Sequence, residues 1–176
     1  MTYDPRIERL INAYNKLVHL EAKCRGMFKF RLLNNRYTVY AIEFHGIEGL
    51  YMERGLIKKR HNHRVEIHIP AEFPIKMPKA KWITPIFHPN IATNGEVCIG
   101  TRWTPMKGVD KIVIELANMA QYVSYNLDNP YNYSAKRWVE QNESQIKNML
   151  YRIEFPPEKD TYIEIVAGED ELEVID

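Results

Sequence analysis

The segment HPNIATNGEVC, residues 88–98, brings a single thiol back toward a side-chain amide. Pro89 fixes its own φ and biases the residue before it toward an extended conformation. The Asn-Gly pair at 94–95 is a strong turn signal, because both residues tolerate positive φ. We therefore expect the chain to reverse within this segment and to place the thiol of Cys98 close to Asn90.

Cys98 is the candidate nucleophile. The reactive form of cysteine is the thiolate, and a thiol beside an amide, with no histidine adjacent to it, favours carriage of an acyl group over peptide cleavage. The alternative is a buried structural cysteine, because free cysteine is among the most buried residue types. The other cysteine, Cys24, ends an amphipathic helical pattern, and we interpret it as structural.

Three further motifs accompany this segment: FPIKMP at 73–78, WTP at 103–105 and DNP at 128–130. With residues 88–98 they resemble, in order, four landmarks of the ubiquitin-conjugating enzymes. These landmarks are an aromatic-Pro-x-x-x-Pro loop, the active-site signature, a Trp-x-Pro loop and a loop that closes over the active site. The resemblance covers roughly residues 4–150. Four ordered motifs with the thiol in register are far more specific than a lone His-Pro-Asn.

The resemblance implies a chemistry for the segment. Cys98 would accept ubiquitin or a ubiquitin-like modifier as a thioester from an activating enzyme, and pass it to an amine such as a substrate lysine. Asn90 would stabilise the oxyanion of that transfer, or order the loop through backbone hydrogen bonds, and the two roles are not exclusive. His88, with Pro89, is implied to hold the loop in place rather than to act as a base.

The resemblance places a gate residue at Asp128 or Asn129, and the sequence leaves both open. An acid could orient an incoming lysine and favour its neutral form, whereas an asparagine could only position it. Alternatively, Asp128 forms an Asx turn ahead of the last helix.

Two partner surfaces are also implied. Trp103 is expected in the core, and a small exposed apolar patch beside it suits a weak, transient ligase contact. The residues expected to contact the ligase are Ile75, Lys76, Pro105 and Met106. The outer face of the first helix would meet the activating enzyme, although a polar helix face is as often only solvated. Its residues are Arg6, Arg9 and Lys16.

Periodicity predicts an α+β fold: a first helix, a four-stranded antiparallel meander, the catalytic loop and C-terminal helices. This order agrees with the ubiquitin-conjugating-enzyme fold. Gly46, Gly49 and Gly55 are interpreted as a loop region, Asp4 as the cap of the first helix and Ser134 as the cap of the last. The predicted helices span 5–24, 111–123 and 134–150, and the predicted strands 28–32, 37–44, 65–69 and 80–84.

Composition fits one domain. The chain has 176 residues, of which 45% are hydrophobic and 27% charged, and no run of about 18 apolar residues. With two cysteines and a polar N-terminal pattern, we expect no signal peptide, a reducing compartment and a cytoplasmic monomer. No metal or organic cofactor is expected, because His61, His63 and His68 lack partnering ligands at metal spacing. Nucleic-acid binding is disfavoured, since the basic stretch 58–64 has no interleaved aromatic residues.

Charge divides the chain into an expected catalytic domain, residues 1–152, and an acidic extension, residues 153–176. The first carries 23 Lys and Arg against 14 acids, and the second carries one Lys against nine acids. The extension could dock on the basic body, face a partner or remain a solvated tail. Within it, 162–166 and 172–175 could form a terminal hairpin.

The chain also departs from the family pattern. Cys98 is usually followed by a Leu-Asp pair and a longer path to the tryptophan, whereas here only residues 99–102 precede Trp103. This divergence is the basis for a hypothesis of a prokaryotic conjugation system. The alternative functions are a non-catalytic scaffold of the same fold, against which Cys98 in register argues, and a thiol peptidase, for which no motif supplies a histidine.

Overall fold

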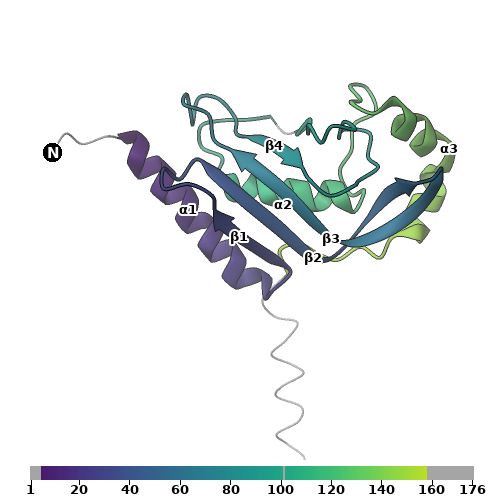
Figure 1. Ribbon diagram of the computed structural model, residues 1–176, viewed down its shortest axis with the longest axis horizontal. Helices are drawn as coiled ribbons and strands as arrows, with labels where there is room; N and C mark the ends of the chain where they lie inside the picture. The colour runs from purple at the N-terminus through teal and green to yellow at the C-terminus, as the bar shows by residue number, and fades with distance from the viewer. Residues whose placement is uncertain (1–4, 101, 158–176) are drawn as a thin grey trace, which may run out of the picture.

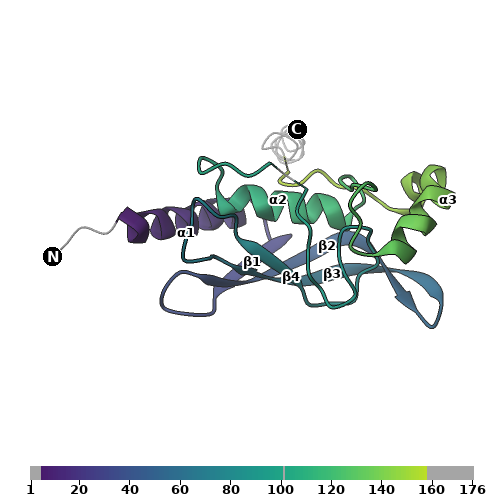
Figure 2. The same cartoon turned by 90° about the horizontal axis from the view of Figure 1, so that it is seen from above.

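The computed structural model describes residues 5–100 and 102–157 (Figure 1). A four-stranded antiparallel sheet in the order β1-β2-β3-β4 forms one layer. Helices α1 and α2 lie over one face of this sheet, and α3 lies beyond the end of the β2–β3 pair (Figure 2). The predicted α+β fold is therefore confirmed. The strands are β1 Phe28–Leu32, β2 Val39–Glu53, β3 Leu56–His68 and β4 Lys79–Trp82, and the helices are α1 Pro5–Cys24, α2 Val109–Ala120 and α3 Tyr133–Met149.

Helix α1 follows its sequence pattern closely. Its buried residues recur every three or four positions and turn one face toward the core: Leu10, Ala13, Leu17, Leu20 and Cys24. Cys24 is fully buried, and burial raises the pKa of its thiol to about 11. A protonated, enclosed thiol is a packing group rather than a nucleophile.

The interpretation of the three glycines as a loop region is wrong. β2 continues through Gly46 and Gly49, with a register shift against β3 between His45 and Gly49. Gly49 makes room for the ring of His63, since a Cβ there would lie 2.8 Å from its Cε1. Only Gly55, at φ +78°, belongs to the turn of this long hairpin. Glycine marks bulges and close approaches within strands as well as loops.

The outer half of this hairpin supports α3. A second core of buried side chains joins the β2–β3 hairpin and α3 to the segment after α2. Its residues are Leu50, Tyr122, Val139, Ile146 and Leu150. The cap of α3 is Asn132, whose Oδ1 accepts a hydrogen bond from the amide of Ala135 at 3.1 Å, rather than the predicted Ser134. The position of α3 therefore fixes the chain that leads into it, residues 124–132.

The packed body continues past residue 152. The ring of Phe155 is buried, with centroids 6.4 Å from Phe28 and 5.7 Å from Phe44. Arg152 donates to the backbone carbonyls of Gln121 and Tyr122 at 3.1 and 2.8 Å. Asp4 and the terminal hairpin expected at 162–175 lie outside the described residues. Among those described, no helix has the length and apolar character needed to cross a membrane.

Candidate active site

The segment of residues 88–98, which is the expected catalytic turn, reverses as the sequence predicts. The amide of Cys98 donates to the carbonyl of Asn90 at 2.9 Å, and the amide of Gly95 donates to Ala92 at 2.9 Å. Gly95 has φ +90°, and a Cβ there would lie 2.1 Å from the carbonyl oxygen of Trp82. The turn thus requires glycine at residue 95, and it packs directly on the end of β4.

His88 is fully buried behind this turn. Its Nδ1 accepts a hydrogen bond from the amide of Asn90 at 3.1 Å, and its Nε2 lies 3.3 Å from the carbonyl of Ser124. Only the neutral ring with its proton on Nε2 satisfies both contacts. Burial lowers the pKa of His88 to about 3, so the ring stays neutral. This geometry joins the catalytic turn to the segment after α2 and offers no base to Cys98.

The side-chain amide of Asn90 is used entirely by the backbone of the neighbouring loop. Its Oδ1 accepts from the amide of Asn126 at 2.7 Å, and its Nδ2 donates to the carbonyl of Asn126 at 2.7 Å. A longer contact of 3.4 Å runs from Nδ2 to the carbonyl of Asn129. Asn90 therefore holds the 126–129 loop against the turn, and it could face an oxyanion only by releasing the longer contact.

Cys98 is partly exposed in a cleft of about 510 Å³ between the catalytic turn, α2 and the 124–128 loop. Two carboxylates lie in its walls, Glu115 from α2 and Asp128 from the loop, and Glu115 accepts a hydrogen bond from the hydroxyl of Ser124. Asn129 is not one of the described residues that line this cleft. The lining residues are Asn90, Cys98, Gly100, Glu115, Met119, Ser124, Tyr125, Asn126, Leu127 and Asp128.

Sequence reasoning missed Tyr131. Its phenol lies near Cys98, and the negative charge of Cys98 is the main cause that raises the pKa of Tyr131. Its amide donates to the carbonyl of Pro89 at 2.8 Å. The only signal in the sequence was its place directly after the DNP motif, which does not show that the chain turns back to the thiol.

Two of the four implied ligase residues and two of the three implied helix residues line one hollow of about 330 Å³, whereas Ile75 and Lys76 do not line it. Arg9 and Lys16 line it from α1, and Pro105 and Met106 line it from the loop before α2. Arg6 lies apart from this hollow and donates from its Nε to the carbonyl of Ala71 at 3.1 Å.

Two apolar side chains, one in the 73–78 loop and one directly after the WTP motif, are largely exposed. Ile75 is 78% exposed and Met106 is 89% exposed. Trp103 ties the loops together, because its Nε1 donates to the carbonyl of Pro74 at 2.8 Å while its ring packs on Phe73. Lys76 is paired with Glu72 at 2.6 Å and is exposed beside Ile75.

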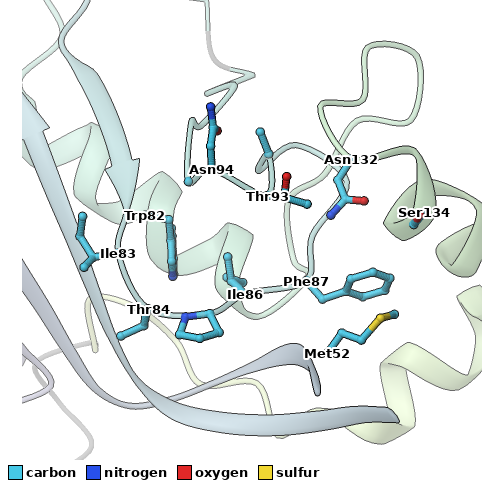
Figure 3. Close-up of a pocket in the computed structure, with 13 residues that line it drawn as sticks. Met52, Trp82, Ile83, Thr84, Ile86, Phe87, Thr93, Asn94, Asn132 and Ser134 are labelled. Atoms are coloured by element: carbon cyan, nitrogen blue, oxygen red, sulfur yellow. The ribbon is translucent and has the colours of Figure 1, made fainter. Parts of the chain in front are cut away.

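A second hollow, of about 460 Å³, lies beside the catalytic turn (Figure 3). It opens between the turn that carries Thr93 and Asn94 and the start of α3 at Asn132 and Ser134 (Figure 3). No titratable side chain is among its described lining residues, so these residues offer no ionisable acid or base. No cluster of three or more potential metal ligands occurs within residues 5–100 and 102–157.

Comparison with known proteins agrees with this fold. A family model described as "Ubiquitin-conjugating enzyme" matches residues 16–153. Because the match covers well over half of the chain, the chain belongs to the ubiquitin-conjugating enzyme family. A solved Plasmodium yoelii structure described as a ubiquitin-conjugating enzyme shares the fold, with a TM-score of 0.60, 19% identity and coverage of 85% of this chain and 93% of that one. Human ubiquitin-conjugating enzyme E2 G1 matches with a TM-score of 0.51 and 24% identity over 68% and 98% of the two chains.

Two curated relatives match shorter segments. Ubiquitin-conjugating enzyme E2 15 of Schizosaccharomyces pombe is 30% identical over 103 residues, which are 49% of this chain and 60% of that protein. Ubiquitin-conjugating enzyme E2 S of Drosophila melanogaster is 41% identical over 56 residues, 30% of this chain and 27% of that protein. The matched segments thus span about 60% or less of these relatives. Both are eukaryotic, and the hypothesis of a prokaryotic origin gains no support from them.

Two buried histidines are expected to make stability depend on pH. Burial lowers the pKa of His88 to about 3 and that of His63 to about 4, whereas histidine in the unfolded chain titrates near 6.5. The unfolded chain therefore takes up protons that the folded protein excludes, and the free energy of unfolding falls as the pH drops below about 6.5, levelling off near pH 3. At pH 5 each histidine should lower it by about 2 kcal/mol.

Urea unfolding at pH 7 and pH 5 measures this effect. The matched control is His68→Gln, at an exposed position of β3. Between pH 7 and pH 5 this variant should lose as much free energy of unfolding as the wild type. A free energy of unfolding that does not fall between pH 7 and pH 5 would show that the two rings are not buried in the neutral form.

Proposed function

We propose that this chain is an active ubiquitin-conjugating enzyme, in which Cys98 carries ubiquitin or a ubiquitin-like modifier as a thioester. The observation that carries the proposal is the partly exposed thiol in a 510 Å³ cleft, with its backbone fixed by the carbonyl of Asn90. Exposure on one side admits a modifier's C-terminal tail, and the rigid turn holds the sulfur in one place for attack.

The test is thioester formation. The protein is incubated with ATP, a charged activating enzyme and modifier, and the products are separated on a non-reducing gel. The expected result is an adduct of one modifier per chain that disappears in reducing agent. A charged activating enzyme that transfers nothing to the chain would favour the second candidate, a non-catalytic scaffold of the same fold.

The remaining site residues take supporting roles in this proposal. His88 and Pro89 keep the turn in place, because the ring of His88 bonds to both sides of the site and the carbonyl of Pro89 accepts two amides from the chain before α3. Asn90 orders the 126–129 loop and becomes an oxyanion donor if its contact with Asn129 opens during transfer.

The proposed gate residue is Asp128 rather than Asn129, because Asp128 lines the cleft that holds Cys98. We expect Asp128→Asn, which keeps the size and removes the charge, to slow transfer from the thioester to free lysine about tenfold at neutral pH. Charging by the activating enzyme should not change. Single-turnover discharge measures the effect, with Asn129→Ala as the control. An equal loss in both variants would mean that the loop, and not the carboxylate, matters.

The proposed partner surface is the patch formed by Ile75 and Met106, flanked by Lys76 and Pro105. Truncating a well-buried apolar anchor at an interface commonly costs more than about 1 kcal/mol. We therefore expect Ile75→Ala combined with Met106→Ala to weaken a matched ligase at least about fivefold. Transfer to free lysine without ligase should be unchanged.

Binding by calorimetry and ligase-stimulated discharge check this prediction. Leu33→Ala is the matched control, because Leu33 is a 44% exposed apolar side chain outside the patch. If the control loses as much ligase affinity as the double variant, the patch is not the docking surface. The hollow beside the patch, lined by Arg9 and Lys16, is proposed for the activating enzyme, with Arg6 on the same helix.

A further inference from the structure

One face of the sheet is left uncovered. Helices α1 and α2 lie over the other face, and no described element lies over this one (Figure 2). Successive side chains of a strand point to opposite faces of a sheet. Every second residue of β1 and β4 is exposed, and the residues between them pack toward the helices. The exposed set therefore lies on the uncovered face.

The charge of this face is positive. Residues directly opposite each other on neighbouring antiparallel strands lie on the same face, so the register of the sheet identifies the members of the face. It places five Lys and Arg side chains there against two carboxylates. The cations are Lys29, Arg31, Arg64, Lys79 and Lys81, and the carboxylates are Glu43 and Glu66.

Most of these cations have no carboxylate partner. Glu43 lies 3.7 Å from Arg64, and Glu66 lies 3.1 Å from the ring of His68. The other four cations form no ion pair with any carboxylate of the described residues: Lys29, Arg31, Lys79 and Lys81. A hollow of about 350 Å³ opens on the face, and Ala41 and the cations of β1 are among its lining residues.

The last described residues lead the chain to this sheet. The ring of Phe155 packs on Phe28 and Phe44, with centroids 6.4 and 5.7 Å apart. Lys29 and Glu43, the next members of the same two strands, belong to the uncovered face. The chain continues for residues 158–176, which in extended form can reach about 60 Å. This length is ample to pass the edge strand β1 and cross the face.

The sequence of residues 158–176, called the acidic segment below, has the complementary charge. It contains eight Asp and Glu against one Lys. Because it belongs to the same chain as the sheet, its effective concentration at the face is of the order of millimolar. A contact that would be weak between separate molecules is therefore well populated within one chain.

We propose that the acidic segment docks on the uncovered face of the sheet and keeps other acidic partners away from it. Its carboxylates pair with the four cations that have no partner in the described body: Lys29, Arg31, Lys79 and Lys81. The inference is independent of the chemistry proposed for Cys98, because none of these residues lines the cleft that holds the thiol.

The first experiment compares amide NMR spectra of the full chain and of a full-length variant with a partly neutralised acidic segment. Charges interact over roughly 20 Å at about 20 mM salt and over roughly 4 Å at about 0.5 M salt. We expect the two proteins to differ at low salt in the amide signals of β1, β4 and Arg64, and to agree at high salt. The substitutions are Glu169→Gln, Asp170→Asn, Glu171→Gln and Glu173→Gln.

The control signals are those of Lys111 and Lys147, two exposed cations on helices α2 and α3. Differences centred on these helices, or none beyond the substituted residues, would overturn the inference. Differences that increase with protein concentration would mean that the acidic segment of a second copy occupies the face, and they would equally contradict docking within one chain.

The second experiment uses a fluorescent peptide with the sequence of residues 158–176 as a probe at low salt. The wild type already holds its own segment on the face, so the neutralised variant should bind the probe at least about fivefold more tightly. Addition of Arg31→Gln and Lys81→Gln to that variant should weaken the probe at least about fivefold. Fluorescence anisotropy measures both effects.

The matched control adds Lys111→Gln and Lys147→Gln instead, which removes the same charge outside the face and should leave the probe within about twofold. Equal loss in the two charge variants would mean that net charge alone attracts the probe. Equal binding to the wild type and the neutralised variant would mean that the face stands open to acidic partners. Either result would overturn the docking of the acidic segment.

Discussion

Replacement of Cys98 by serine is expected to abolish the reductant-sensitive adduct completely. A hydroxyl in the same position forms an oxygen ester if it reacts at all, and such an ester survives reducing agent and lysine. Replacement by alanine should leave no adduct of either kind. Loss of the nucleophile removes the covalent intermediate altogether, which makes this the largest effect predicted for any single residue.

The matched control is Cys24→Ala. Cys24 is buried in the core, and burial raises the pKa of its thiol to about 11, so it should neither carry the modifier nor be needed for its transfer. The measurement is a non-reducing gel with and without reducing agent, run beside the charged activating enzyme. An adduct that persists in Cys98→Ala and vanishes in Cys24→Ala would reverse the assignment.

The second large effect is expected from Asn90→Ala. The variant loses the hydrogen bonds that fix the loop at Asn126 and Asn129 and leaves the amide of Asn126 without its acceptor. We expect transfer to free lysine to fall about 100-fold and the free energy of unfolding to fall by about 2 kcal/mol. Discharge kinetics and urea unfolding measure the two quantities separately.

The pair of measurements distinguishes the two roles of Asn90. A large loss of transfer with unchanged stability would mean that Asn90 acts as an oxyanion donor and contributes little to the loop. Asn94→Ala is the control, because its side chain lies in the same turn but is exposed and bonds only to the amide of Glu96. It should keep both transfer and stability close to those of the wild type.

The sequence predicted those parts of the fold that depend on local patterns. Helix α1 has an apolar face at helical spacing, and β1 alternates strictly over Phe28–Leu32, so burial and secondary structure agree there. The catalytic turn was predictable because Gly95 and Pro89 restrict the backbone locally. Its closure onto Asn90 follows from the same turn.

The rest depends on contacts between distant residues. The β2–β3 extension is half exposed, and its glycines serve a bulge and the ring of His63, so neither periodicity nor turn residues indicated strands. Tyr131 lies 33 residues after Cys98 in the chain, and it comes near Cys98 only because the second core holds α3 in place. Phe155 joins the core by packing on Phe28 and Phe44, which no spacing rule could indicate.

The most direct test of the account is the intact mass of the protein after incubation with ATP, charged activating enzyme and modifier, followed by peptide mapping. If Cys98 carries the modifier, the protein gains the mass of one modifier, attached at Cys98 and removed by hydroxylamine. No mass gain, or a modifier attached only to lysine side chains, would contradict it.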